Sequence, residues 1–183
     1  MGKSEVTIQG LRFIPLIDER KLAERVGQMA VQIQQAVAAD DMLFVCMLGG
    51  AFVFASDLLR SMQTPAEIAF VKWSSYEGTA SVGQIREELP LSVPVKDRHV
   101  VVVEDIVESG FTLSRFVQQV MGSGAKSCRI ATLLHKPACQ RYPLELSWVG
   151  FEIGSEFVVG YGLDYNGYGR MLPAIYQQIG DRS

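Results

Sequence analysis

A run of four valines, Val100 to Val103, constrains this chain more than any other feature. The run ends abruptly at Glu104 and Asp105, and Ser109 to Thr112 then read Ser-Gly-Phe-Thr before apolar residues return at helical spacing. This succession predicts a buried strand, a polar loop and a helix. Open α/β sheets bind their ligands at strand ends of this kind.

The polar residues between the strand and the helix indicate the kind of ligand. Two adjacent carboxylates suit the hydroxyls of a sugar or a hard cation. A small polar loop that opens a helix offers backbone N–H groups to a phosphate. A simple helix cap would explain Ser109 and Thr112, but it would not explain Glu104 and Asp105 side by side. The residues therefore favour a sugar phosphate.

The rest of the chain alternates short apolar runs with amphipathic segments. The runs predict strands at 42–48, 68–73, 100–103 and 127–134, and the amphipathic segments predict helices at 18–38, 51–62 and 112–121. In the second helix the expected inward-facing residues are Phe52, Ala55, Leu58 and Leu59. The alternation predicts an α/β fold with a parallel sheet covered by helices on both faces. Residues 74–83 lack apolar periodicity, which leaves a plain surface hairpin and a lid both open.

Composition narrows the class of protein. The chain has 183 residues, 48% of them hydrophobic, and carries 17 basic against 20 acidic residues with no basic run. We therefore expect one domain that binds neither nucleic acid nor membranes. The three cysteines are far apart, which argues against a zinc site or a disulfide framework. No long apolar segment resembles a signal peptide or a membrane span, so a cytoplasmic protein is expected.

Residues Glu104 to Thr112 resemble the phosphoribosyl-diphosphate motif of type I phosphoribosyltransferases. Met47 to Gly50 resembles the short pyrophosphate loop of that family, and Ser75-Tyr76 resembles the Ser-Tyr of its mobile loop. The block from Phe157 to Asn166 resembles hypoxanthine-guanine phosphoribosyltransferases in particular. The resemblance covers nearly the whole chain, from about Ile14 onward.

The resemblance implies a parallel β-sheet core flanked by helices, with a small hood formed by the N- and C-terminal segments. It implies a single domain over 1–183, a mobile loop at about 74–86, and a purine-binding hood contributed by about 1–17 and 136–183. A homodimer or homotetramer is expected.

The resemblance also implies the residues that bind phosphoribosyl diphosphate. Glu104 and Asp105 would face the ribose hydroxyls directly or through Mg²⁺, Ser109 to Thr112 would hold the 5′-phosphate, and Arg170 would contact pyrophosphate. The full set is Leu48, Gly49, Ser75, Tyr76, Glu104, Asp105, Glu108, Ser109, Gly110, Phe111, Thr112 and Arg170.

For the base, the resemblance implies Lys136, Phe157, Val158 and Asp164. Lys136 would donate to the 6-oxygen of the purine, Phe157 would stack on the ring, and the carbonyl of Val158 would read its edge. An ammonium has no acceptor for an amine, so Lys136 would select a 6-oxopurine. Asp164 would also approach a second Mg²⁺ on the diphosphate, which makes Glu104, Asp105 and Asp164 the expected metal residues.

The implied reaction transfers a 5-phosphoribosyl group to hypoxanthine or guanine, with Glu108 and Lys136 as catalytic residues. Glu108 stands where the family has aspartate, and Leu48 stands where several relatives have lysine. Cys139 and Gln140 occupy a region where relatives often place an arginine, and Arg141 could substitute. A cis peptide between Leu48 and Gly49 is also implied.

Two other classes of protein stay open at this point. One is a sensor that binds phosphoribosyl diphosphate but has lost catalysis, although no basic helix for DNA binding is present. The other is an unrelated α/β nucleotide-binding enzyme, which the absence of Gly-x-Gly-x-x-Gly and P-loop motifs argues against.

Overall fold

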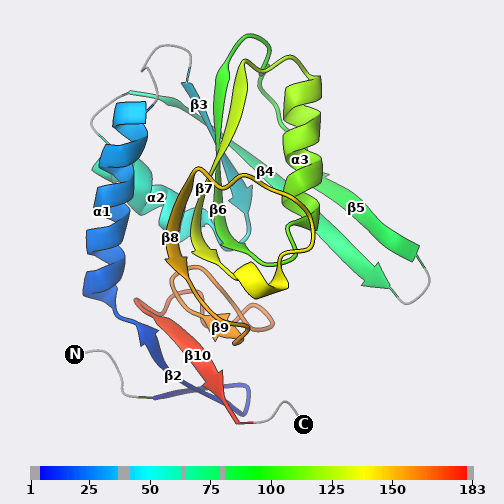
Figure 1. The fold of residues 1–183 in the computed structure, drawn as a ribbon. Helices are drawn as coiled ribbons and strands as arrows, with labels where there is room; N and C mark the ends of the chain where they lie inside the picture. Colours follow the sequence, from blue (N-terminus) through cyan, green and yellow to red (C-terminus); the bar gives the residue numbers. More distant parts are fainter. Residues whose placement is uncertain (1–4, 37–41, 63–64, 79–80, 181–183) are drawn as a thin grey trace.

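A computed structural model describes residues 5–36, 42–62, 65–78 and 81–180, with the side chains of 75–84 outside that description. Its larger sheet has six strands in the order β5-β4-β3-β6-β7-β8 (Figure 1). All neighbours in it are parallel except β5, which runs antiparallel to β4. The strands are β3 (Met42–Leu48), β4 (Glu67–Gly78), β5 (Ser81–Leu89), β6 (His99–Val107), β7 (Ser127–His135) and β8 (Trp148–Glu152). The expected parallel α/β fold is confirmed.

Helices cover both faces of this sheet. The helices α1 (Glu19–Ala36) and α2 (Phe52–Ser61) lie on one face, and α3 (Phe111–Gly122) lies on the other (Figure 1). A single turn of 3-10 helix, η1 (Pro137–Cys139), follows β7. No helix in these described ranges is long and apolar enough to cross a membrane.

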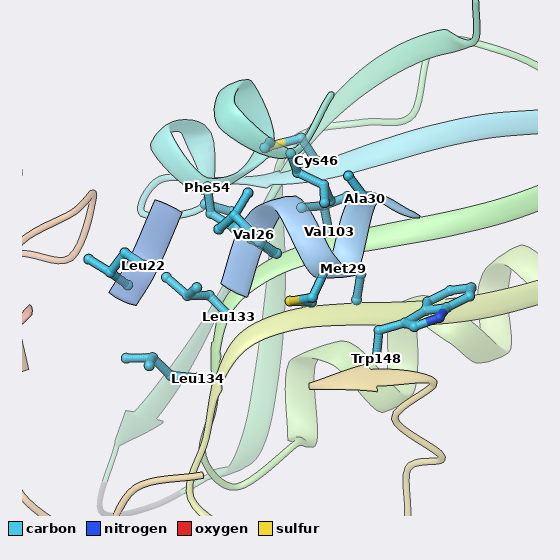
Figure 2. Packing of buried hydrophobic residues seen from close by; sticks show 14 of the residues in the cluster. Leu22, Val26, Met29, Ala30, Cys46, Phe54, Val103, Leu133, Leu134 and Trp148 are labelled. Atoms are coloured by element: carbon cyan, nitrogen blue, oxygen red, sulfur yellow. The ribbon is translucent and has the colours of Figure 1, made fainter. Parts of the chain in front are cut away.

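The valine run of β6 is buried on both of its faces. Val101 and Val103 pack with the residues of α1 and α2, whereas Val100 and Val102 pack with those of α3. Figure 2 shows the first of these clusters, with Met29 of α1 among its labelled residues. Because side chains alternate along a strand, four consecutive β-branched residues suit a strand covered on both sides.

A second, smaller sheet joins the two ends of the chain. It has four antiparallel strands in the order β1-β2-β10-β9 and forms the expected hood (Figure 1). Its strands are β1 (Val6–Ile8), β2 (Leu11–Ile17), β9 (Val158–Val159) and β10 (Ile175–Ile179). Phe13 and Tyr176, both almost fully buried, form its core.

Strand β6 ends later than expected. It continues to Val107, so Glu104 and Asp105 lie inside the strand and not in the loop that follows it. The reason is the parallel ladder with β7, whose register runs on from Glu104 to Val107. Backbone pairing with a neighbouring strand thus overrides the local polarity of the two acids.

Two other expectations also change. Phe52 is 39% exposed and does not face inward; Phe54 takes its place in the core, because the face of α2 that packs on the sheet runs through Phe54, Ala55 and Leu58. Residues 74–78 extend β4 beyond the expected 68–73, and β4 pairs with β5, to which residues 81–83 belong. Residues 37–38, the end of the helix expected at 18–38, lie outside the described residues.

Candidate active site

A cavity of about 250 Å³ opens at the carboxyl ends of β3 and β6, beside Trp73 within β4, and extends to the start of α3. Seven of the residues expected to bind phosphoribosyl diphosphate line it: Leu48, Glu104, Glu108, Ser109, Gly110, Phe111 and Thr112. The strand-end position is the one that parallel α/β sheets use for ligands.

The loop before α3 is shaped for an anion. Gly110 has φ of +78°, and a Cβ there would lie 2.9 Å from Leu144, so the position requires glycine. The carbonyl of Ser109 accepts hydrogen bonds from the amides of Arg141 (3.0 Å) and Tyr142 (3.1 Å). This anchoring holds the first turn of α3, whose backbone N–H groups lack helical partners, against the cavity.

Two crowded carboxylates lie on β6. Asp105 is 9% exposed and Glu104 is half-buried. Burial raises the pKa of Glu104 well above its usual range, and the neighbouring Asp105 raises it further. Burial is also the main reason that the pKa of Asp105 is raised. A hard cation would favour the charged forms of both groups, because it takes carboxylate oxygens as ligands and offsets the cost of burying their charge.

Glu104 and Asp105, expected to face one Mg²⁺, lie on β6, whereas Asp164, expected to approach a second Mg²⁺, lies in the loop before β10. Asp164 pairs with Arg170, whose Nη2 lies 2.7 Å from Asp164 Oδ1. Among the residues that the structure describes, no group of three or more His, Cys, Asp or Glu side chains is arranged to hold a metal ion. Any cation here would need oxygen ligands from a substrate as well.

The short loop between β3 and α2 lies between Asp105 and Arg170. Its Leu48–Gly49 peptide bond is cis, as expected. A Cβ on Gly50 would lie 1.6 Å from Asp105 Oδ2, and a Cβ on Gly49 would lie 3.4 Å from Arg170 Nη2. The fold thus places the Arg170 guanidinium against Gly49 and the Asp105 carboxylate against Gly50.

The two expected catalytic residues contact one another. Lys136 is only 3% exposed, and its Nζ donates to Glu108 Oε1 at 2.5 Å. The side chain of Glu108 is 54% exposed and lines the cavity. The backbone amide of Lys136 donates to the carbonyl of Val107 (2.9 Å), which fixes the lysine beside the end of β6.

The remaining expected residues are placed as follows. Phe157 is half-buried, with its ring edge-on to Tyr165 at 5.8 Å, and Val158 is buried in β9. Neither lines the 250 Å³ cavity. The backbones of Ser75 and Tyr76 belong to β4, but their side chains lie outside the described residues.

Among the described residues, no arginine in the region directly after Lys136 lines the cavity. Gln140 Oε1 lies 2.8 Å from His135 Nε2, and Arg141 contributes its backbone amide to the Ser109 carbonyl. The proposed substitution by the Arg141 side chain stays a prediction.

Trp73 is a cavity residue that the sequence analysis missed. It lines the cavity, packs edge-on against Phe116 at 5.1 Å, and donates from Nε1 to Glu87 Oε1 at 3.2 Å. The sequence pattern contained a signal for this residue, because Trp73 ends the strand expected at 68–73. The parallel register pairs Leu48 with Lys72, so Trp73 lies next to the end of β3 even though β4 itself continues to Gly78.

Comparison with known proteins agrees with this geometry. Residues 16–166 match the model of the phosphoribosyl transferase domain. The chain is 37% identical over 154 residues to hypoxanthine phosphoribosyltransferase of Haemophilus influenzae, covering 82% of this chain and 86% of that protein. It is 34% identical over 176 residues to hypoxanthine-guanine phosphoribosyltransferase of Mycobacterium tuberculosis, covering 88% and 87%.

Other relatives are longer. The bifunctional protein TilS/HprT of Listeria monocytogenes is 40% identical over 161 residues, but this chain spans only 25% of its length. The crystal structure of a hypoxanthine phosphoribosyltransferase from Staphylococcus aureus superposes with a TM-score of 0.86 at 32% identity, covering 90% of each chain. From its matched domain, its relatives and its fold, the chain belongs to the phosphoribosyl transferase domain family.

Proposed function

We propose that the protein transfers a 5-phosphoribosyl group from phosphoribosyl diphosphate to hypoxanthine or guanine, giving IMP or GMP and pyrophosphate. The observation that carries this proposal is the buried Lys136 ammonium, which donates to Glu108, a residue that lines the cavity beside α3. The names of the relatives from Haemophilus and Mycobacterium support the same reaction.

In this proposal the 5′-phosphate binds at the start of α3. Ser109 to Thr112 supply backbone N–H groups and two hydroxyls at a helix N-terminus. Glu104 and Asp105 face the ribose hydroxyls from β6. Both groups belong to the edge of the sheet that holds the cavity, so one sugar phosphate can engage them together.

The diphosphate lies along Leu48 and Gly49, where the Arg170 guanidinium supplies positive charge. When bound, Mg²⁺ neutralises the leaving diphosphate. Glu104 and Asp105 would hold one ion and Asp164 would approach another, with substrate oxygens completing each shell. The rest of the catalysis is positioning and stabilisation of charge at the ribosyl carbon.

The base binds between the cavity and the hood formed by about 1–17 and 136–183. Lys136 has three donors, and Glu108 accepts only one of them. The others are available to the 6-oxygen of a purine, while Glu108 holds or receives a proton near N7. Phe157 stacks on the ring, and the Val158 carbonyl reads its edge.

The β4–β5 hairpin is the proposed lid. Closure of about residues 74–86 would bring Ser75 and Tyr76 over the reacting centre and exclude water. We further propose a cytoplasmic homodimer or homotetramer, for which the exposed Val31 of α1 (51%) offers apolar surface.

The test supplies the purified protein with Mg²⁺, phosphoribosyl diphosphate and one base at a time: hypoxanthine, guanine, xanthine or adenine. We expect IMP or GMP and no comparable AMP, because Lys136 cannot accept a hydrogen bond from a 6-amino group. AMP formation at a similar rate would refute the role of Lys136. Binding of phosphoribosyl diphosphate without any product would instead indicate the sensor.

A further inference from the structure

A partly buried hydrogen bond ties α2 to the loop that carries Arg170. Tyr161 is 7% exposed, and its Oη donates to Asp57 Oδ2 at 2.6 Å, across 104 positions of sequence. Burial and the neighbouring carboxylate raise the pKa of Tyr161, so its hydroxyl stays protonated and remains a donor. Neither residue lines the 250 Å³ cavity.

The backbone around Tyr161 needs such an anchor. Tyr161 has φ of +49°, which is unfavourable for a residue other than glycine, and its amide donates to the carbonyl of Leu172 at 2.8 Å. The next residue, Gly162, approaches the β3–α2 loop so closely that a Cβ on it would lie 2.0 Å from the Gly50 carbonyl. The position of Tyr161 therefore determines how the two loops pack.

Gly162 in turn holds Arg170. Its carbonyl accepts a hydrogen bond from Arg170 Nη1 at 2.7 Å, and its amide donates to the Arg170 carbonyl at 2.9 Å. The other guanidinium nitrogen pairs with Asp164 beside Gly49. A shift of Gly162 would therefore move the one arginine that lies against Gly49 among the described residues.

We propose that Tyr161 and Asp57 are positioning residues for the diphosphate half of the site. This inference rests on the proposed function, in which Gly49 and Arg170 bind diphosphate. The hydrogen bond acts through Gly162 on Arg170 and on the glycine loop, without touching the ligand. The 5′-phosphate half is held by α3 and the Ser109 loop, to which this contact does not extend.

The experiment compares two probes that separate the halves of the site. Binding of inorganic pyrophosphate with Mg²⁺ and of ribose 5-phosphate is measured by titration calorimetry for wild type, Tyr161→Phe, Asp57→Ala and Asp57→Asn. The matched control is Tyr168→Phe, which removes a hydroxyl from a residue 60% exposed in the same loop. Thermal unfolding of each variant confirms that it is folded.

We expect Tyr161→Phe and Asp57→Ala to weaken pyrophosphate binding by about fivefold, the size of one net hydrogen bond. Asp57→Asn should bind nearly as wild type, because its amide oxygen still accepts from Tyr161. Ribose 5-phosphate affinity should not change in any variant, and Tyr168→Phe should leave both affinities unchanged.

Unchanged pyrophosphate affinity in Tyr161→Phe would overturn the positioning role, as would an equal loss for both probes, which indicates general damage. Failure of the wild type to bind pyrophosphate would instead refute the diphosphate site, and with it the proposed function.

Discussion

The contact between Glu108 and Lys136 is predicted to contribute measurably to stability. Lys136 is buried and Glu108 Oε1 accepts from its Nζ at 2.5 Å. Replacing Glu108 with glutamine removes the charge that compensates a buried ammonium. Replacing Lys136 with methionine keeps an unbranched apolar stem of similar length but removes the ammonium itself.

The structure sets the expected magnitude between two limits. Exposed ion pairs contribute about 0.2–1 kcal/mol, whereas breaking a fully buried pair costs about 3–5 kcal/mol. Lys136 is 3% exposed, but the Glu108 side chain is 54% exposed and is screened by water. We therefore expect a coupling free energy of about 2 kcal/mol between the two side chains.

A double-mutant cycle measures this coupling. Glu108→Gln, Lys136→Met and the double variant are unfolded in urea at pH 7 and 25 °C. Glu145→Gln, an exposed glutamate in the 141–147 segment, paired with Lys136→Met provides the control cycle. A coupling below about 0.5 kcal/mol for Glu108 and Lys136 would mean that the contact does not hold in solution and would refute the argument.

The same position affects catalysis in the proposed reaction. General acid–base groups contribute about 100-fold or more to turnover, so Glu108→Gln should lose at least that factor. Glu108→Asp keeps a carboxylate and should lose far less. Equal turnover in both variants would place Glu108 outside the chemistry.

Two further predictions concern packing and pH. Gly50→Ala should destabilise the fold by more than about 2 kcal/mol in urea unfolding, because its Cβ would lie 1.6 Å from a buried carboxylate oxygen. The control Gly27→Ala should be neutral or stabilising, because nothing lies within 4 Å of its Cβ. Burial raises the pKa of Cys46 and of Cys128 to about 12, so both thiols should resist iodoacetamide at pH 8 in the native protein, as read by mass spectrometry. Because the folded state holds these protons more tightly than the unfolded state, the free energy of unfolding should fall as pH rises from about 9 toward 12. Labelling of the native protein at the rate of the unfolded protein would contradict the raised pKa of the thiols, on which both expectations rest.

The sequence predicted best where one physical rule dominates. Four valines in a row require burial on two faces, and β6 satisfies that requirement between α1 and α3. The small loop from Ser109 to Thr112 lines the cavity as expected, because a strand-to-helix junction places it at the sheet edge.

Sequence patterns could not predict the contacts between residues that lie far apart in the chain. The end of β6 depends on its ladder with β7, and the inward face of α2 depends on how that helix packs on the sheet, so Phe52 was misplaced. The pairing of Asp164 with Arg170 depends on how a distant loop folds back. Local composition carries no signal for such tertiary geometry.

The hood has a consequence for the order in which the protein can assemble during synthesis. Strand β9 is hydrogen-bonded to β10, and β10 joins β2 near the start of the chain. The residues around the 250 Å³ cavity, by contrast, are all translated by residue 113. The amides that anchor the Ser109 loop follow at Arg141 and Tyr142, so a nascent chain can organise its sugar-phosphate half once these residues are made. The half assigned to the base must wait until Ile175–Ile179 has left the ribosome and closed a loop of nearly the whole chain.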